Sequence, residues 1–267
     1  MKLSLNSSTI KTTPLLEKIR VAGEAGYKGI ELWAVEIYEH VGRGGEVSDV
    51  EKALADQGLS VPCMIAVRNW GETSDWEYKL ALDEARRRME LAARLGAPFV
   101  VCTPPLEQPG IDNLHTGYQD LLKIGRESGT RALLEYISFF ASLNNIADSV
   151  TVLDRTGDPE GALVVDAFHN WNSNSTLDDL KALPVECIAH YHIDDAHSDK
   201  PALTQKDPDR VMLGDGQIDL ASEIAVLKDK GYSGWVSLEL FNEELWAKDP
   251  LEVAKLGMER LLELIPE

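Results

Sequence analysis

Four side chains that could act as metal ligands lie at the ends of apolar runs. Glu135 follows RALL, Asp166 ends ALVVD, His192 lies at the end of ECIAHYHI, and Glu239 lies near the end of WVSLEL. An unpaired carboxylate that closes a buried run costs several kcal/mol, so a cation should lie near these acids. Three carboxylates and one imidazole suit one divalent metal ion. Their hardness favours Mn²⁺, Mg²⁺ or Co²⁺, and Zn²⁺ accepts the same ligands.

A single acid at the end of a strand has an ordinary explanation, because loop caps and structural ion pairs also place carboxylates there. Four successive strand ends that carry such side chains favour a metal site over separate loop caps and ion pairs. His190 lies two positions before His192, so on a strand both rings face the same side. We interpret His190 as a core or hydrogen-bonding histidine one layer deeper. Glu31 lies inside an apolar strand and is expected to be an acid deep in the fold rather than a substrate contact.

The segments that must position these residues alternate between strand and helix signals. Strands are predicted at residues 2–6, 29–33, 61–67, 98–103, 131–136, 162–166, 186–193 and 235–240. Helices are predicted from 14 to 26, from a cap at Ser48 to Gly58, and over 75–95, 113–128, 144–155, 220 onward and 250–264. Continuous apolar strands suit a parallel sheet that is covered on both faces. Eight such units over residues 1–267 predict one domain, a single (β/α)8 TIM barrel, with its chemistry at the carboxyl ends of the strands.

A doubly wound nucleotide-binding sheet is the alternative fold. It would usually place a glycine-rich turn after the first strand, where this sequence has Ser7, Ser8 and Thr9. The glycine clusters at 42–45 and 214–216 lack the Lys-Ser/Thr of a phosphate loop. The barrel is therefore the favoured prediction.

The charge and hydropathy of the chain limit its partners. Lys and Arg number 26 against 45 Asp and Glu, which gives a net charge of −19 and disfavours a nucleic-acid partner. No segment reaches the roughly 18 apolar residues of a membrane helix, and the first apolar run is too short for a signal peptide. We expect a cytoplasmic protein without membrane contact. A homo-oligomer remains an alternative to a monomer. The apolar face of a predicted helix can pack against the barrel or against a second copy of the chain, and helical periodicity does not distinguish the two.

The order of the motifs resembles the xylose isomerase-like barrel superfamily of sugar isomerases and epimerases. The resemblance runs from MKLSLN to the end of the chain and is carried by DAFH at 166–169, HYHIDD at 190–195, DRV at 209–211 with GDGQID at 214–219, and SLELF at 237–241. It implies a metal held by Glu135, Asp166, His192 and Glu239. It also implies that Glu135 and Glu239 are catalytic and move protons, and that His169 and Arg210 hold substrate oxygens.

The chemistry implied is isomerisation of a small-molecule keto-polyol or ketose, with an inosose favoured, through a metal-stabilised enediolate. A ketose 3-epimerase, an inosose dehydratase or a 3-keto-glycoside lyase would use the same site. A metal-binding barrel subunit without catalysis is the alternative from another class, although all six site positions carry competent side chains. Endonuclease relatives have additional histidines where this chain has Arg68, Thr103 and Arg210, so a DNA-repair site is disfavoured.

Overall fold

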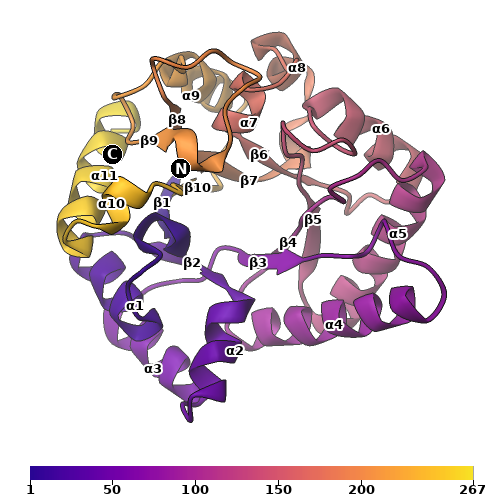
Figure 1. The fold of residues 1–267 in the computed structure, drawn as a ribbon, viewed down its shortest axis with the longest axis horizontal. Helices are drawn as coiled ribbons and strands as arrows, with labels where there is room; N and C mark the ends of the chain where they lie inside the picture. The colour runs from indigo at the N-terminus through magenta and orange to yellow at the C-terminus, as the bar shows by residue number, and fades with distance from the viewer. Residues whose placement is uncertain (267) are drawn as a thin grey trace.

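Eight parallel strands close a barrel in the computed structural model, which describes residues 1–266 (Figure 1). Around the barrel their order is β1, β10, β7, β6, β5, β4, β3 and β2. The strands are β1 (Lys2–Asn6), β2 (Gly29–Trp33), β3 (Met64–Val67), β4 (Phe99–Cys102), β5 (Arg131–Leu134), β6 (Leu163–Asp166), β7 (Ile188–Ile193) and β10 (Trp235–Leu238). The predicted (β/α)8 barrel is confirmed.

Helices surround the barrel and cover the outer faces of the strands. They are α1 (Leu15–Glu24), α3 (Val47–Gln57), α4 (Asp75–Arg94), α5 (Ile111–Ser128), α6 (Ile146–Thr156), α8 (Leu177–Ala182), α9 (Leu220–Asp229) and α11 (Pro250–Leu264). Within residues 1–266, no helix combines the length and the apolar composition needed to cross a bilayer.

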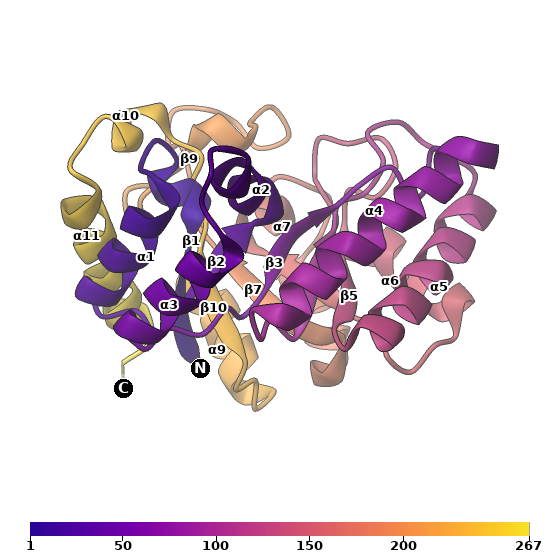
Figure 2. The same cartoon turned by 90° about the horizontal axis from the view of Figure 1, so that it is seen from below.

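Further short elements lie in the loops between strands and helices. They are η1 (Ser7–Ile10), α2 (Ala34–Gly42), α7 (Ala167–Trp171), η2 (Val185–Cys187), β8 (Asp195–Ala196), η3 (Asp207–Asp209), β9 (Arg210–Val211) and α10 (Glu243–Trp246). Figure 2 shows α2, β9 and α10 at one end of the barrel and both chain termini at the other. The first end is the carboxyl end of the strands, where barrel enzymes carry their sites.

Strands β1 and β2 match their predicted ranges, and the other six barrel strands are one to three residues shorter than predicted, because backbone pairing does not extend over the whole apolar run. The predicted cap at Ser48 is wrong. Helix α3 begins at Val47, and the backbone N–H of Glu46 donates to Asp49 Oδ2 at 2.7 Å. Ser48 lies inside the first turn and its hydroxyl donates to Glu46.

Strand register brings two of the predicted site residues together. Asp166 is the last residue of β6 and pairs with His192 on β7, which in turn pairs with Ser237 on β10. Glu239 directly follows β10, and Glu135 directly follows β5. The helix faces around these strands are apolar and buried, so the backbone at the polar strand ends has a fixed position.

Candidate active site

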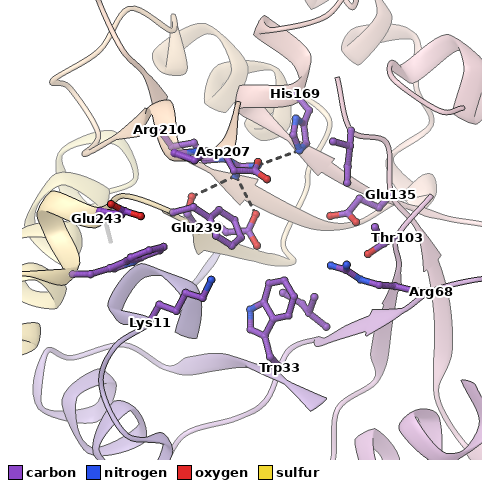
Figure 3. Close-up of a pocket in the computed structure, with 15 residues that line it drawn as sticks. Lys11, Trp33, Arg68, Thr103, Glu135, His169, Asp207, Arg210, Glu239 and Glu243 are labelled. Atoms are coloured by element: carbon purple, nitrogen blue, oxygen red, sulfur yellow. Dashed lines mark hydrogen bonds and ion pairs between the residues drawn. The ribbon is translucent and has the colours of Figure 1, made fainter. Parts of the chain in front are cut away.

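A cavity of about 440 Å³ opens at the carboxyl end of the barrel (Figure 3). Four of the predicted site residues line it, namely Glu135, His169, Arg210 and Glu239. Its volume falls within the range of small-molecule sites, roughly 300–1,000 Å³. The lining residues lie on or after all eight barrel strands, so the site is built by the barrel and not by one local motif.

Three of the four predicted metal ligands form one buried group. Single ligand atoms of Asp166, His192 and Glu239 all lie within 4.8 Å of one another. His192 Nδ1 is 3.1 Å from Glu239 Oε2 and 3.7 Å from Asp166 Oδ2. Glu135 is not a member of this close group, although it lines the same cavity.

The donor atoms of this group fit a divalent cation. His192 Nδ1 is buried and has no hydrogen-bond partner in the described part of the chain, and it faces two carboxylates. Burial alone would lower the pKa of His192, but the charges of Glu239 and Glu31 raise it well above the usual value. The same negative charges would favour a cation on Nδ1.

Glu31 fixes the orientation of the His192 ring. His192 Nε2 lies 3.2 Å from Glu31 Oε1 and 3.1 Å from Oε2, and Glu31 is fully buried. With the ring hydrogen on Nε2, directed at Glu31, the lone pair of Nδ1 faces Asp166 and Glu239. Burial would raise the pKa of Glu31, yet His190 and His192 together lower it below the usual range. Glu31 is therefore the deep acid that the sequence predicted.

Asn6 links Glu31 to Glu239 and was missed by sequence reasoning. Its Nδ2 donates to Glu31 Oε2 and, at 2.9 Å, to Glu239 Oε1. Its position at the carboxyl end of β1 was the available signal, since the other site residues share that position on their strands. His190 is fully buried with Nε2 against Glu31 Oε1, in the core place expected for it.

Arg210 is buried among the acids of the site. Its Nη1 lies 3.1 Å from Asp166 Oδ2 and 3.0 Å from Glu239 Oε2, and it also donates to Asp194 Oδ2. Its Nη2 lies 3.0 Å from Asp207 Oδ1. The strands β8 and β9 pair Ala196 with Arg210 and so hold the arginine over the barrel. The charge of Arg210 is thus compensated by several carboxylates within the protein itself.

His169 is held beside Arg210 (Figure 3). Arg210 Nη2 lies 3.1 Å from His169 Nε2, and Ser138 Oγ lies 3.2 Å from Nδ1. Burial lowers the pKa of His169 despite the opposing charge of Asp166, so the ring is neutral at pH 7. Asp166 also caps α7 by accepting from the His169 N–H at 2.8 Å, which ties the two side chains to one turn.

Glu135 faces the cavity from the end of β5, next to Thr103 in Figure 3. Burial, followed by the like charge of Glu239, raises the pKa of Glu135 to about 8, while a hydrogen bond with Thr103 opposes that rise. A carboxyl group with a pKa near neutrality can both accept and return a proton at physiological pH. Glu135 and the metal-ligand candidate Glu239 thus line the same cavity.

Known proteins resemble this chain along nearly its whole length. It matches the family model of the xylose isomerase-like TIM barrel over residues 19–264. An inosose isomerase of Halalkalibacterium halodurans is 25% identical, with 99% of this chain and 96% of that protein covered. A 3-dehydroshikimate dehydratase of Pseudomonas putida is 23% identical over 99% of this chain, which corresponds to 42% of that longer protein.

A solved structure shares the same fold. The crystal structure of the IolI protein with a bound zinc atom matches with a TM-score of 0.92 and 23% identity, covering 99% of this chain and 98% of that one. The barrel topology and the full-length family match agree with the resemblance that the strand-end motifs indicated. This chain belongs to the xylose isomerase-like TIM barrel family.

Proposed function

We propose that this chain is a divalent-metal-dependent isomerase of a keto-polyol or ketose. The observation that carries the proposal is the buried group of Asp166, His192 and Glu239, because its member Glu239 lines the same cavity as Glu135. Relatives named inosose isomerase and a fold neighbour that binds zinc support it. Inososes are therefore the first substrates to test, and Mn²⁺, Zn²⁺, Co²⁺ and Mg²⁺ the first ions.

The metal would be held by Asp166, His192 and Glu239, with Glu135 as the fourth ligand. When bound, a divalent cation supplies Lewis-acid stabilisation of negative charge on a substrate oxygen. The position of Nδ1 in His192, fixed through Glu31, prepares the group without rearrangement of the ring.

The two glutamates would move the proton. One carboxylate, Glu135 or Glu239, takes the proton from the carbon next to the ketone. A proton returned to the former ketone carbon, together with transfer of the neighbouring hydroxyl proton to the former ketone oxygen, gives isomerisation. A proton returned to the opposite face of the same carbon gives epimerisation. Glu135, with a pKa of about 8, suits a step that needs both protonation states. The neutral ring of His169 and the guanidinium of Arg210 would orient the substrate oxygens.

The test is Glu135→Gln, with Glu36→Gln as a matched control. Glu36 pairs with Lys18 outside the cavity, so its substitution also removes one carboxylate from an ion pair. We expect Glu135→Gln to abolish turnover of inosose while binding of the same inosose persists by calorimetry, and Glu36→Gln to keep both. Undiminished turnover in Glu135→Gln would contradict its role. Inosose binding without turnover in the unmodified protein would favour a non-catalytic binding subunit.

A dehydratase is the second candidate, because a relative carries that name. It would begin with the same proton removal and continue with loss of a hydroxyl group from the next carbon as water. NMR of the product separates the two reactions: dehydration gives an enol or its 1,2-diketone tautomer, seen as a new vinyl or methylene signal, and isomerisation moves the carbonyl group and gives neither signal.

A further inference from the structure

The loop after β3 presents an arginine without a protein partner to the cavity. Arg68 is exposed, lines the cavity, and forms neither an ion pair nor a hydrogen bond within residues 1–266. Every other arginine of the chain forms at least one of these in the same range. In a protein with a net charge of −19, an arginine without a carboxylate partner is unusual. Its guanidinium group is therefore available to a ligand in the cavity.

The backbone beside Arg68 is held in a defined conformation. Asn69 has a φ of 63°, in the left-handed region that residues other than glycine seldom adopt. Trp70 is 1% exposed and its Nε1 donates to the carbonyl oxygen of Thr103 at 2.8 Å. A Cβ atom on Gly117 would lie 2.5 Å from the Trp70 carbonyl oxygen, so α5 packs directly against this loop. Arg68 is therefore mounted on an anchored loop.

Lys11 supplies a second cation to the same cavity. Its Nζ lies 5.1 Å from the centre of the Trp246 ring. Trp246 Nε1 donates to the Ser8 carbonyl oxygen at 2.8 Å and Thr12 Oγ1 donates to the Trp246 carbonyl at 3.0 Å, so the loop after β1 and α10 hold each other. Lys11 forms no ion pair with any described residue, Glu243 on the same rim included. Figure 3 shows Lys11 and Arg68 on either side of Trp33.

The remaining cationic groups of the cavity are already engaged. Arg210 is surrounded by carboxylates, and the ring of His169 is held with Nε2 3.1 Å from Arg210 Nη2. Lys11 and Arg68 are thus the positive charges that a ligand could meet. A guanidinium group binds a carboxylate or phosphate through two parallel N–H···O bonds, and a lysine adds a point charge.

We propose that Lys11 and Arg68 form an anion subsite that binds a carboxylate or phosphate group of the substrate. The substrate is then a polyhydroxylated ketone whose far end is acidic, with its ketone directed to Glu135 and Glu239. The placement of the ketone beside Glu135 and Glu239 rests on the proposed function. The anion subsite adds that the other end of the substrate is negatively charged. Arg68 is the principal contact because it has the anchored loop and no competing acid within hydrogen-bonding or ion-pair distance.

Binding by calorimetry of three six-carbon probes to the metal-loaded protein tests the subsite. The probes are D-fructose, D-fructuronate and D-fructose 6-phosphate, which share a ketone at C2 and differ in the charge at C6. We expect at least one anionic probe to bind about tenfold or more tightly than fructose, the scale of a charge-assisted bidentate contact. Tighter binding of D-fructuronate identifies a carboxylate, and tighter binding of fructose 6-phosphate identifies a phosphate.

Two substitutions and one control identify the residues. Arg68→Gln should remove most of the anionic preference and leave fructose affinity unchanged, and Lys11→Met should remove a smaller part. Arg43→Gln removes one exposed positive charge outside the cavity and should change neither affinity. Equal affinities for all three probes, absence of binding by either anion, or a preference that survives Arg68→Gln would overturn the subsite. Anion binding that depends on Arg68 without α-proton exchange in any probe would instead refute the proposed function and leave the subsite standing.

Discussion

Glu31→Gln tests whether a residue outside the ligand group prepares the metal site. Glu31 accepts from His192 Nε2 through two close oxygens and from Asn6 Nδ2, and it also touches His190. Glutamine has the same shape but offers one oxygen and one NH₂ group. Either orientation of the amide sets its NH₂ against Asn6 or a histidine ring, and the negative charge is lost.

The expected effect follows from the role of Glu31 as the partner of a ligand. Substitution of such partners typically weakens metal binding by about 10- to 100-fold, or about 1.4 to 2.7 kcal/mol. We expect Glu31→Gln to fall in this range, because both contacts from Glu31 to the His192 ring are fully buried. The loss of the negative charge and the loss of the ring orientation both weaken metal binding.

Competition against a chromophoric chelator at fixed pH measures this loss for Zn²⁺ and Mn²⁺. Glu36→Gln is the control, since Glu36 also pairs with a buried cation, Lys18, but lies away from the barrel interior. Metal affinity of Glu31→Gln within twofold of the unmodified protein would refute the reasoning. An equal loss in Glu36→Gln would show that the effect is general instability.

Three further outcomes are expected. Arg210→Met leaves Asp166, Asp194 and Glu239 without their shared cation, so urea unfolding without metal should show a loss of roughly 3–5 kcal/mol, and a loss below 1 kcal/mol would contradict this. Burial raises the pKa of Glu223 to about 7, so the folded state holds a proton that the unfolded chain releases near pH 4.5, and stability from this group falls as pH rises between these values. Glu223→Gln should therefore gain up to about 3 kcal/mol relative to the unmodified protein between pH 5 and pH 8, and an unchanged difference would count against it. A divalent ion at 100 times its Kd should raise the free energy of unfolding by about 2.7 kcal/mol, and no rise with any of the four ions would speak against a metal site.

The barrel and its strand-end residues could be predicted from the sequence because parallel strands produce continuous apolar runs and expose their ends on one face. Register then brings Asp166 beside His192, as the strand order requires. The short elements α2, α7 and α10 could not be predicted with confidence from periodicity, since four to nine residues provide one to three turns. Their positions depend on tertiary contacts, such as Trp246 Nε1 with the Ser8 carbonyl.

The membership of the cavity wall was the least predictable part. Lys11 and Asp207 line the cavity but carry no local motif. Their loops are held by contacts distant in sequence, such as Trp246 Nε1 with the Ser8 carbonyl and Asn172 Nδ2 with the Gln205 carbonyl. Arg68 was visible in the sequence as a departure from endonuclease relatives. That Arg68 lacks an ion-pair partner is visible only in the structure, because ion pairs between loops cannot be inferred from the spacing of residues in the sequence.

Deuterium uptake at the carbon next to the ketone is the most direct test of the proposed chemistry. Metal-loaded protein in D₂O would be incubated with inososes, free ketoses and acidic ketoses and followed by NMR. We expect uptake with at least one ketone and its loss in Glu239→Gln. No uptake with any of them, in protein that holds one metal ion per chain, would contradict the isomerase proposal.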